Sequence, residues 1–151
     1  MSQAFKIREA EPGDEKVIMD LVQELAVYEK EPDAVINTPE QLRVDLFEDP
    51  ICECLVVEVD GVVRGMALYY TSYSTWKGRC LYLEDLYVQP EYRRGGVGIA
   101  LFEQLISLAK ERGVKRMDWQ VLEWNEPAIA FYKRIGATLD PEWYNGRLFF
   151  D

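Results

Sequence analysis

A run of two arginines and three glycines is the part of the sequence best suited to bind an anion. Arg93-Arg94-Gly95-Gly96-Val97-Gly98 lies between an expected strand and an expected helix. Glycine lets the backbone turn tightly and approach a ligand. The unpaired N–H groups at a helix start and the helix dipole attract negative charge, and arginine adds permanent charge. The run therefore predicts a phosphate-binding turn, and the alternative is an ordinary glycine-rich turn before a helix.

Two common phosphate motifs do not fit this run. The Gly-Lys-Ser/Thr sequence of a P-loop is absent. A dinucleotide fingerprint belongs to the first strand–helix unit of a parallel sheet, whereas here three strands that we expect to be antiparallel come first.

The second group that could do chemistry is the adjacent pair Glu84 and Asp85, because the chain has no histidine. That absence excludes Ser–His–Asp and Cys–His catalysis and every His-ligated metal site. A general base must then be Asp, Glu, Tyr, Cys, Lys or water. On a regular strand these two carboxylates point to opposite faces, and one of them could simply pair with a surface base.

The cysteines indicate neither a metal site nor a disulfide framework. Cys52, Cys54 and Cys80 are an odd number of thiols without histidine. Cys52 and Cys54 are spaced to share one face of a strand. We expect small buried side chains, no bound metal and a reducing, cytoplasmic location.

Charge is unevenly distributed along the chain. The net charge of −10 argues against nucleic acid or an anionic membrane as partner. Residues 1–60 carry 16 acidic and 5 basic side chains, whereas residues 61–151 carry 11 and 12. The acidic front half suits a cationic partner, unless its acids only keep the surface soluble.

The length of 151 residues suits one domain, so we expect a single domain over residues 1–151. The N-terminus has no apolar segment typical of a signal peptide. No apolar run approaches the ~20 residues of a membrane span.

Periodicity predicts the elements that must position these residues. Period-two and β-branched runs predict strands over Phe5–Glu9, Cys52–Val59, Val62–Tyr73, Cys80–Val88 and Met117–Leu122, and a final hairpin that turns at Tyr144–Arg147 and closes on Leu148–Phe150. Apolar stripes, caps and glycine stops predict helices from Asp14 through Leu25, from Thr38 to about Phe47, from about Val97 to Gly113, and from Asn125 through Tyr132 to Gly136. This order predicts an α+β fold of three layers, with a mixed, mostly antiparallel sheet flanked by helices.

At this point the sequence resembles a known family. Val88–Gly98 (VQPEYRRGGVG) looks like the pyrophosphate signature of the GCN5-related N-acetyltransferase (GNAT) superfamily, and the element order is similar to that fold along nearly the whole chain. Tyr82–Val88 (YLEDLYV), Ser74–Arg79 (STWKGR) and Glu123–Lys133 (EWNEPAIAFYK) resemble the diamine (spermidine/spermine) and thialysine acetyltransferases.

The resemblance implies acetyl-CoA as the acetyl donor. Its pyrophosphate would lie on backbone N–H groups of the helix start, and its pantetheine arm would pair with the end of the preceding strand like an added strand. In the family, the residue matching Asn125 touches the CoA arm, although here Asn125 could equally be a plain helix cap. The implied cofactor-binding residues are Leu86, Tyr87, Val88, Arg93, Arg94, Gly95, Gly96, Val97, Gly98, Ile99, Asn125 and Tyr132.

Acetyl transfer to an amine needs a neutral amine, a donor for the carbonyl oxygen, and a proton for the departing thiolate. We expect Glu84 to accept the proton, through water, and Asp85 to contact the substrate. The family has a bulge in this strand, which would re-aim one carboxylate. Tyr132 matches the family's general acid, and otherwise would be an ordinary packing aromatic. Direct attack by the amine is expected, because Cys80 has no base partner.

Tyr28–Asp33 (YEKEPD) resembles the acidic, aromatic segment that gathers the cationic substrate in this family. The expected substrate-binding residues are Tyr28, Glu29, Glu31, Trp76, Glu84 and Asp85. Ser74-Thr75 replaces the acid that the polyamine enzymes carry beside the aromatic turn, as in the thialysine type, and leaves a shorter diamine or lysine-like amine open. The relatives are homodimers, so a homodimer is expected.

Two other functions remain open on the sequence. The same fold could acetylate a protein N-terminus or lysine, which needs an uncovered acceptor groove. It could also bind CoA without catalysis, against which the Glu84, Asn125 and Tyr132 set argues.

Overall fold

A five-stranded mixed sheet forms the centre of the first part of the chain. The computed structural model describes residues 4–93 and 95–151. The strand order is β1-β2-β3-β4-β5, and the bounds are β1 (Phe5–Glu9), β2 (Glu53–Val59), β3 (Val62–Ser74), β4 (Gly78–Val88) and β5 (Met117–Asp118). β1 to β4 pair antiparallel, and β5 pairs parallel with β4. The predicted mixed, mostly antiparallel sheet is confirmed.

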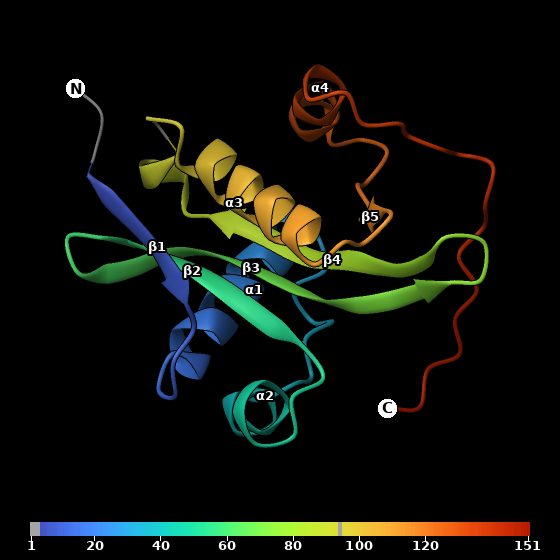
Figure 1. The fold of residues 1–151 in the computed structure, drawn as a ribbon. Coiled ribbons are helices and arrows are strands. Elements are labelled where there is room, and N and C mark those ends of the chain that lie inside the picture. Colours follow the sequence, from blue (N-terminus) through green and yellow to red (C-terminus); the bar gives the residue numbers. More distant parts are fainter. Residues whose placement is uncertain (1–3, 94) are drawn as a thin grey trace. The chain divides into compact units, whose positions relative to one another are not determined.

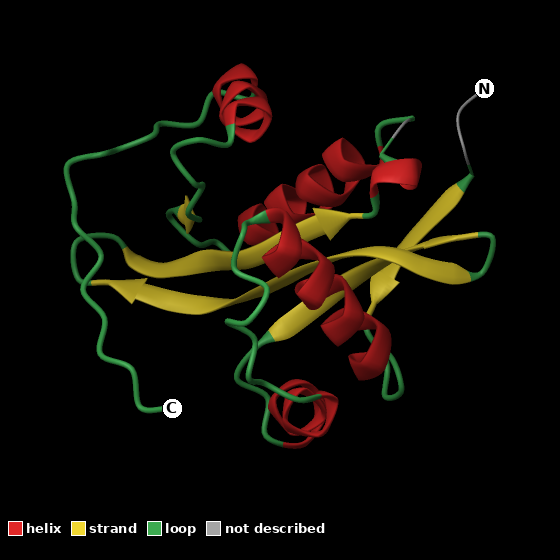
Figure 2. Ribbon diagram, turned by 180° about the vertical axis from the view of Figure 1, so that it is seen from behind, coloured by secondary structure: helices red, strands yellow, loops and turns green. Residues whose placement is uncertain are grey.

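Helices cover both faces of this sheet, as Figures 1 and 2 show from opposite sides. α1 (Glu15–Tyr28) lies on one face and α3 (Val97–Glu111) on the other. α2 (Pro39–Arg43) continues into a π-helical turn over Val44–Glu48. The result is the predicted three-layer α+β architecture.

Burial of apolar side chains explains why the layers stack. On the α1 side, Ile18 and Leu21 pack with Val56 and Met66 of the sheet. On the α3 side, the stripe that includes Leu101 and Leu105 is fully buried. A completely buried Leu or Ile side chain contributes roughly 1.5–3 kcal/mol, so these stripes fix each helix on its face.

Local signals in the sequence set several element ends. Thr38 Oγ1 accepts a hydrogen bond of 3.1 Å from the Gln41 N–H, and Pro39 follows it at the helix start. Asp60 and Gly61 have φ of 54° and 78° and join β2 to β3 by the predicted tight turn. These predictions are confirmed.

The chain divides into two compact units, Met1–Trp119 and Gln120–Asp151, and each is described by itself. In the second unit, α4 (Glu126–Arg134) begins at Asn125, whose Oδ1 accepts a hydrogen bond of 3.4 Å from the Ala128 N–H. The expected single domain stays a prediction.

Two strand predictions are wrong. The strand expected over Met117–Leu122 is only Met117–Asp118, and no hairpin forms at Tyr144–Arg147 or Leu148–Phe150. Residues 120–151, all of which are described, contain α4 and no strand. Apolar residues such as Leu148 and Phe150 favour a strand, but a strand needs a paired neighbour for its backbone groups, and this unit supplies none. In the part of the chain that is described, no helix is long and apolar enough to cross a membrane.

Candidate active site

A β-bulge in β4 sets the direction of the two adjacent carboxylates. Asp85 lies opposite Leu68 of β3, whereas Leu83 lies opposite Tyr69, so Glu84 is the extra residue. Leu68 packs on the core under α1, and cross-strand partners share a face, so Asp85 projects to the α1 side. The bulge that the family resemblance implied is therefore present.

Three predicted carboxylates influence one another at this bulge. Burial raises the pKa of Asp85 to about 7, and the charges of Glu84 and Glu29 add to that rise. Burial also raises the pKa of Glu29, which directly follows α1. The charges of Glu29 and Glu84 thus act on the buried Asp85 carboxylate, which favours a bound cation or a shared proton at Asp85.

Tyr70 of β3 contacts the carboxylate of Glu84, the bulged residue. The sequence alone did not predict this contact. The Tyr70 hydroxyl donates a hydrogen bond of 3.3 Å to Glu84 Oε1. Its ring stacks on Tyr82, its partner across the two strands, at 5.2 Å between centroids. Burial, with the Glu84 charge, raises the pKa of Tyr70 to about 12, so the hydroxyl remains a donor at neutral pH.

The end of β4 offers backbone groups to a ligand. β5 pairs with β4 only at Leu81 and Tyr82, while β4 continues to Val88. Among the described strands, none pairs with this side of β4 from Leu83 to Val88. An extended polar ligand could add here as a strand does, beside the expected residues Leu86, Tyr87 and Val88.

The glycine turn leads into the start of α3. Gly95 and Gly96 both have φ of 78°, and Gly96 is the N-cap. The first helical bond is donated by the Ala100 N–H to the Gly96 carbonyl, at 2.9 Å. The N–H groups of Val97, Gly98 and Ile99 therefore come before the first hydrogen bond within the helix. Within residues 4–93 and 95–151, no side chain caps this helix.

The backbone at this turn is open to a ligand. A side chain added at Gly96 or Gly98 would meet no atom within 4 Å, so the helix start is open. Gly65 has the opposite surroundings: a Cβ there would lie 2.9 Å from the Tyr87 carbonyl oxygen and from Val88, so glycine allows β3 to approach the end of β4. Free N–H groups beside open space are the donor set that phosphate oxygens prefer.

The two arginines of the turn differ. Arg93 Nε donates a hydrogen bond of 2.7 Å to the Val88 carbonyl, and its guanidinium lies 5.5 Å from the Tyr87 ring centroid. Its charge therefore lies beside the end of β4. Arg94, also expected to bind the cofactor, lies outside the described residues.

The remaining expected residues are distributed over other segments. Tyr28 is 42% exposed, Glu31 is exposed, and Trp76 is 90% exposed at the tip of the β3–β4 hairpin. Asn125 and Tyr132 belong to the second unit, where Asn125 caps α4 and the Tyr132 ring lies 5.4 Å from that of Phe131. Capping by Asn125 is confirmed, whereas its contact with a cofactor and the role of Tyr132 stay predictions.

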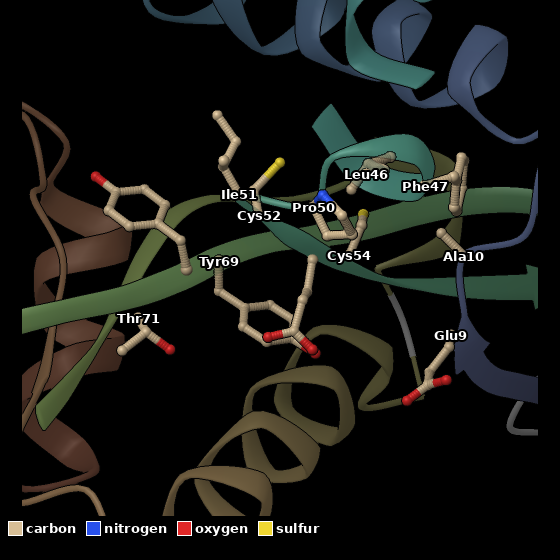
Figure 3. Close-up of a pocket in the computed structure, with 12 residues that line it drawn as sticks. Glu9, Ala10, Leu46, Phe47, Pro50, Ile51, Cys52, Cys54, Tyr69 and Thr71 are labelled. Atoms are coloured by element: carbon tan, nitrogen blue, oxygen red, sulfur yellow. The ribbon is translucent and has the colours of Figure 1, made fainter. Parts of the chain in front are cut away.

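A separate hollow lies where β2 begins (Figure 3). It is a groove of about 460 Å³, lined by residues that include Phe47, Cys52, Cys54, Tyr69 and Tyr70. None of the expected site residues lines it. Cys52 and Cys54 contribute to one core cluster, as their spacing predicted. Among the described residues, no cluster of acids or cysteines could hold a metal ion.

A mixed sheet with a bulged, carboxylate-bearing strand and a glycine-rich helix start defines the acyltransferase class. The chain belongs to the acetyltransferase (GNAT) family, whose model matches residues 18–137. It is an acetyltransferase.

Several relatives carry a more specific name. A thialysine N-epsilon-acetyltransferase from Bos taurus is 45% identical over 140 residues, with 87% of this chain and 82% of the relative covered. A Caenorhabditis elegans protein of the same name is 35% identical over 147 residues, with 95% and 91% covered. These relatives support transfer of the acetyl group to an amine.

Solved structures agree with the fold. An aminoglycoside acetyltransferase from an uncultured soil metagenomic sample has a TM-score of 0.79 at 18% identity, with 97% of both chains covered. A possible acetyltransferase from Clostridium difficile 630 has a TM-score of 0.78 at 24% identity, with 97% and 99% covered. At this identity the likeness concerns the fold alone.

Proposed function

We propose that this protein transfers the acetyl group of acetyl-CoA to a primary amine of a small cationic substrate, such as a diamine, a polyamine or thialysine. The observation that carries the proposal is the carboxylate group Glu29, Glu84 and Asp85 beside the unpaired edge of β4. The names of the thialysine acetyltransferase relatives support the same substrate class.

The chain's backbone binds the donor. Acetyl-CoA supplies an activated acetyl thioester when bound. In this proposal the N–H groups of the helix start, from Arg93 to Ile99, would hold its pyrophosphate, with charge from the two arginines. The edge Leu86–Val88 would pair with its pantetheine arm, and Asn125 would contact the same arm. A backbone N–H near Leu86–Val88 donates to the carbonyl oxygen as negative charge develops.

The carboxylates prepare the amine. Alkyl amines have a pKa near 10, so at neutral pH the substrate arrives as an ammonium and must lose a proton before it can attack. Glu84 accepts that proton through water, while Asp85 contacts the cation. Burial raises the pKa of Asp85 to about 7, so without substrate Asp85 is partly neutral at neutral pH. A bound ammonium group favours the ionised form, which then contacts the cation. Tyr132 donates a proton to the departing thiolate.

The acidic segment at the end of α1 gathers the substrate. Tyr28, Glu29 and Glu31 supply charge and an aromatic face for an ammonium group, and Trp76 adds a second aromatic face from the hairpin tip. No metal takes part in this scheme. We further propose a cytoplasmic homodimer that binds neither nucleic acid nor membranes.

A panel of amines with acetyl-CoA, read by release of the CoA thiol, tests the proposal. Thialysine, lysine and short diamines should release thiol faster than neutral amines, with a rate that rises as pH approaches the amine pKa. Release only with peptide substrates would favour acetylation of a protein instead. Binding of CoA with no release for any amine would contradict an amine acetyltransferase.

A further inference from the structure

A polar network joins α1 to the end of β4, just beyond the carboxylates of the bulge. Glu24 of α1 accepts a hydrogen bond of 3.2 Å from the Tyr87 hydroxyl at one carboxylate oxygen and one of 3.0 Å from the Gln89 side-chain amide at the other. Both oxygens of a half-buried carboxylate are therefore engaged. Burial and the Glu24 charge raise the pKa of Tyr87, so its hydroxyl remains protonated and able to donate.

The network continues into the turn that precedes the glycines. Gln89 Oε1 accepts a hydrogen bond of 3.4 Å from Arg64 Nη1, and the Gln89 N–H donates to the Arg64 carbonyl at 2.9 Å. The Arg64 guanidinium lies 4.7 Å from the centroid of the Tyr92 ring. Tyr92 ends the 3-10 turn Pro90–Tyr92, which leads directly into the glycine-rich run.

The network therefore reaches both halves of the proposed site from one side chain. Glu24 lies just over one helical turn before Glu29, whose charge acts on Asp85 of the bulge. Tyr87 lies in the last residues of β4, where a donor's pantetheine arm is expected, and Gln89 follows this strand on the way to the turn where the pyrophosphate is expected. Glu24 takes no part in the proposed chemistry, so it can affect the reaction only by holding Tyr87 and Gln89 in place.

We propose that Glu24 is a positioning residue that holds the amine-binding end of α1 and the cofactor-binding end of β4 in one arrangement. This inference rests on the proposed function. Its consequence is that weakening the Glu24 contacts weakens binding of both substrates, although Glu24 touches neither.

The test uses an exchange of groups within the network. Glu24→Gln keeps an acceptor for Tyr87 but places an amide donor against the Gln89 donor. Glu24→Gln combined with Gln89→Glu restores one donor facing one acceptor and keeps the net charge. It also leaves a carboxylate oxygen for Arg64. Asp20→Asn is the matched control, because it makes the same change in charge at an exposed position of the same helix.

Calorimetry with CoA and steady-state kinetics with acetyl-CoA and the best amine give the readouts. In Glu24→Gln, the Kd for CoA and the KM for the amine should both rise about three- to tenfold, as expected for the net loss of one hydrogen bond of ordinary strength. The kcat should change less than either. The double variant should recover both constants to within about twofold, and Asp20→Asn should match the unchanged protein.

Equal constants in Glu24→Gln and Asp20→Asn, or a double variant no better than the single one, would overturn the positioning role. If Glu24→Gln does not fold, Tyr87→Phe removes one contact and should weaken CoA binding in the same direction. Unchanged CoA binding there would also overturn it. If the unchanged protein binds no CoA and acetylates no amine, the proposed function itself fails, and the positioning role with it.

Discussion

The Tyr70 hydroxyl donates to Oε1 of Glu84 across the β3–β4 pair, at 3.3 Å and at the residue that the bulge leaves without a cross-strand partner. A bulged residue gains freedom of direction because its neighbours no longer fix its backbone by pairing. The Tyr70 hydrogen bond takes over that task for the carboxylate. Tyr70 therefore acts through Glu84 and need not touch the substrate.

Replacing Tyr70 by Phe should lower kcat about threefold to tenfold, because one hydrogen bond that orients Glu84 is lost while the stacked ring remains. Initial rates at saturating acetyl-CoA and amine measure the effect. Tyr73→Phe is the control, since Tyr73 is 74% exposed on the same strand. Equal rates in both variants would exclude a role for Tyr70 in orienting Glu84 for catalysis.

Variants of Glu84 and Asp85 should change different kinetic constants. Glu84→Gln should lower kcat by about a hundredfold or more, as expected for a lost general base, with a smaller effect on the amine KM. Asp85→Asn should mainly raise the amine KM, because the variant loses a negative charge that faces the ammonium group. Steady-state kinetics with varied amine tests this division, and the reverse pattern would exchange the two roles.

Asp85 should make stability depend on pH. Its pKa is about 7 in the folded protein and 3.8 as its ordinary value, so between these values the folded state binds more protons than the unfolded state. The free energy of unfolding contributed by this group therefore falls as pH rises from about 4 to about 7. Asp85→Asn removes that penalty and should stabilise the protein above pH 7, by at most about 4 kcal/mol.

Urea denaturation of both proteins across this pH range measures the difference. The two curves should converge near pH 4 and separate toward pH 8. Glu31→Gln, at an exposed position, should show no such separation. An Asp85→Asn protein less stable than the unchanged protein at pH 8 would contradict the burial of an uncompensated carboxylate.

Tyr132 offers a test within the second unit. Tyr132→Phe should lower turnover by about tenfold or more, because the departing thiolate loses its proton donor, while calorimetry should show CoA binding largely intact. Tyr144→Phe, at a fully exposed position of the same unit, is the control. Full turnover in Tyr132→Phe would exclude its role as the acid.

The sequence predicted those elements whose signals are local. The cap at Thr38 and the turn at Asp60-Gly61 act over a few residues, and both are found where predicted. Counting back from the Ser74–Gly78 turn also pairs Tyr70 with Tyr82 correctly. If the same count is continued without a bulge, it pairs Leu68 with Glu84, whereas in the structure Leu68 pairs with Asp85.

Signals that depend on distant partners were not predictable. The bulge was expected only from the family, because no residue pattern within β4 requires it. Tyr70 and Glu24 gain their roles from hydrogen bonds to residues 14 and more than 60 positions away. The strand predicted over Leu148–Phe150 failed for the same reason, since apolar residues favour a strand only where another strand lies beside them.

Gly98 allows a test of the proposed diphosphate site that does not disturb the fold. Gly95 and Gly96 have positive φ, so side chains there strain the backbone. Gly98 is helical, and a Cβ built on it meets no protein atom within 4 Å. Gly98→Glu should therefore leave the folded protein intact, because the side chain has room and an acidic residue in the first turn suits the helix dipole.

The same carboxylate would add negative charge beside the N–H groups of Val97 and Ile99, where the pyrophosphate is expected. The Kd for CoA should rise about tenfold or more in Gly98→Glu, while the temperature of thermal unfolding stays the same or rises. Calorimetry and thermal denaturation on one preparation measure both effects. A Gly98→Glu variant that binds CoA as tightly as the unchanged protein would exclude this helix start as the diphosphate site, since a carboxylate there would repel a closely bound anion.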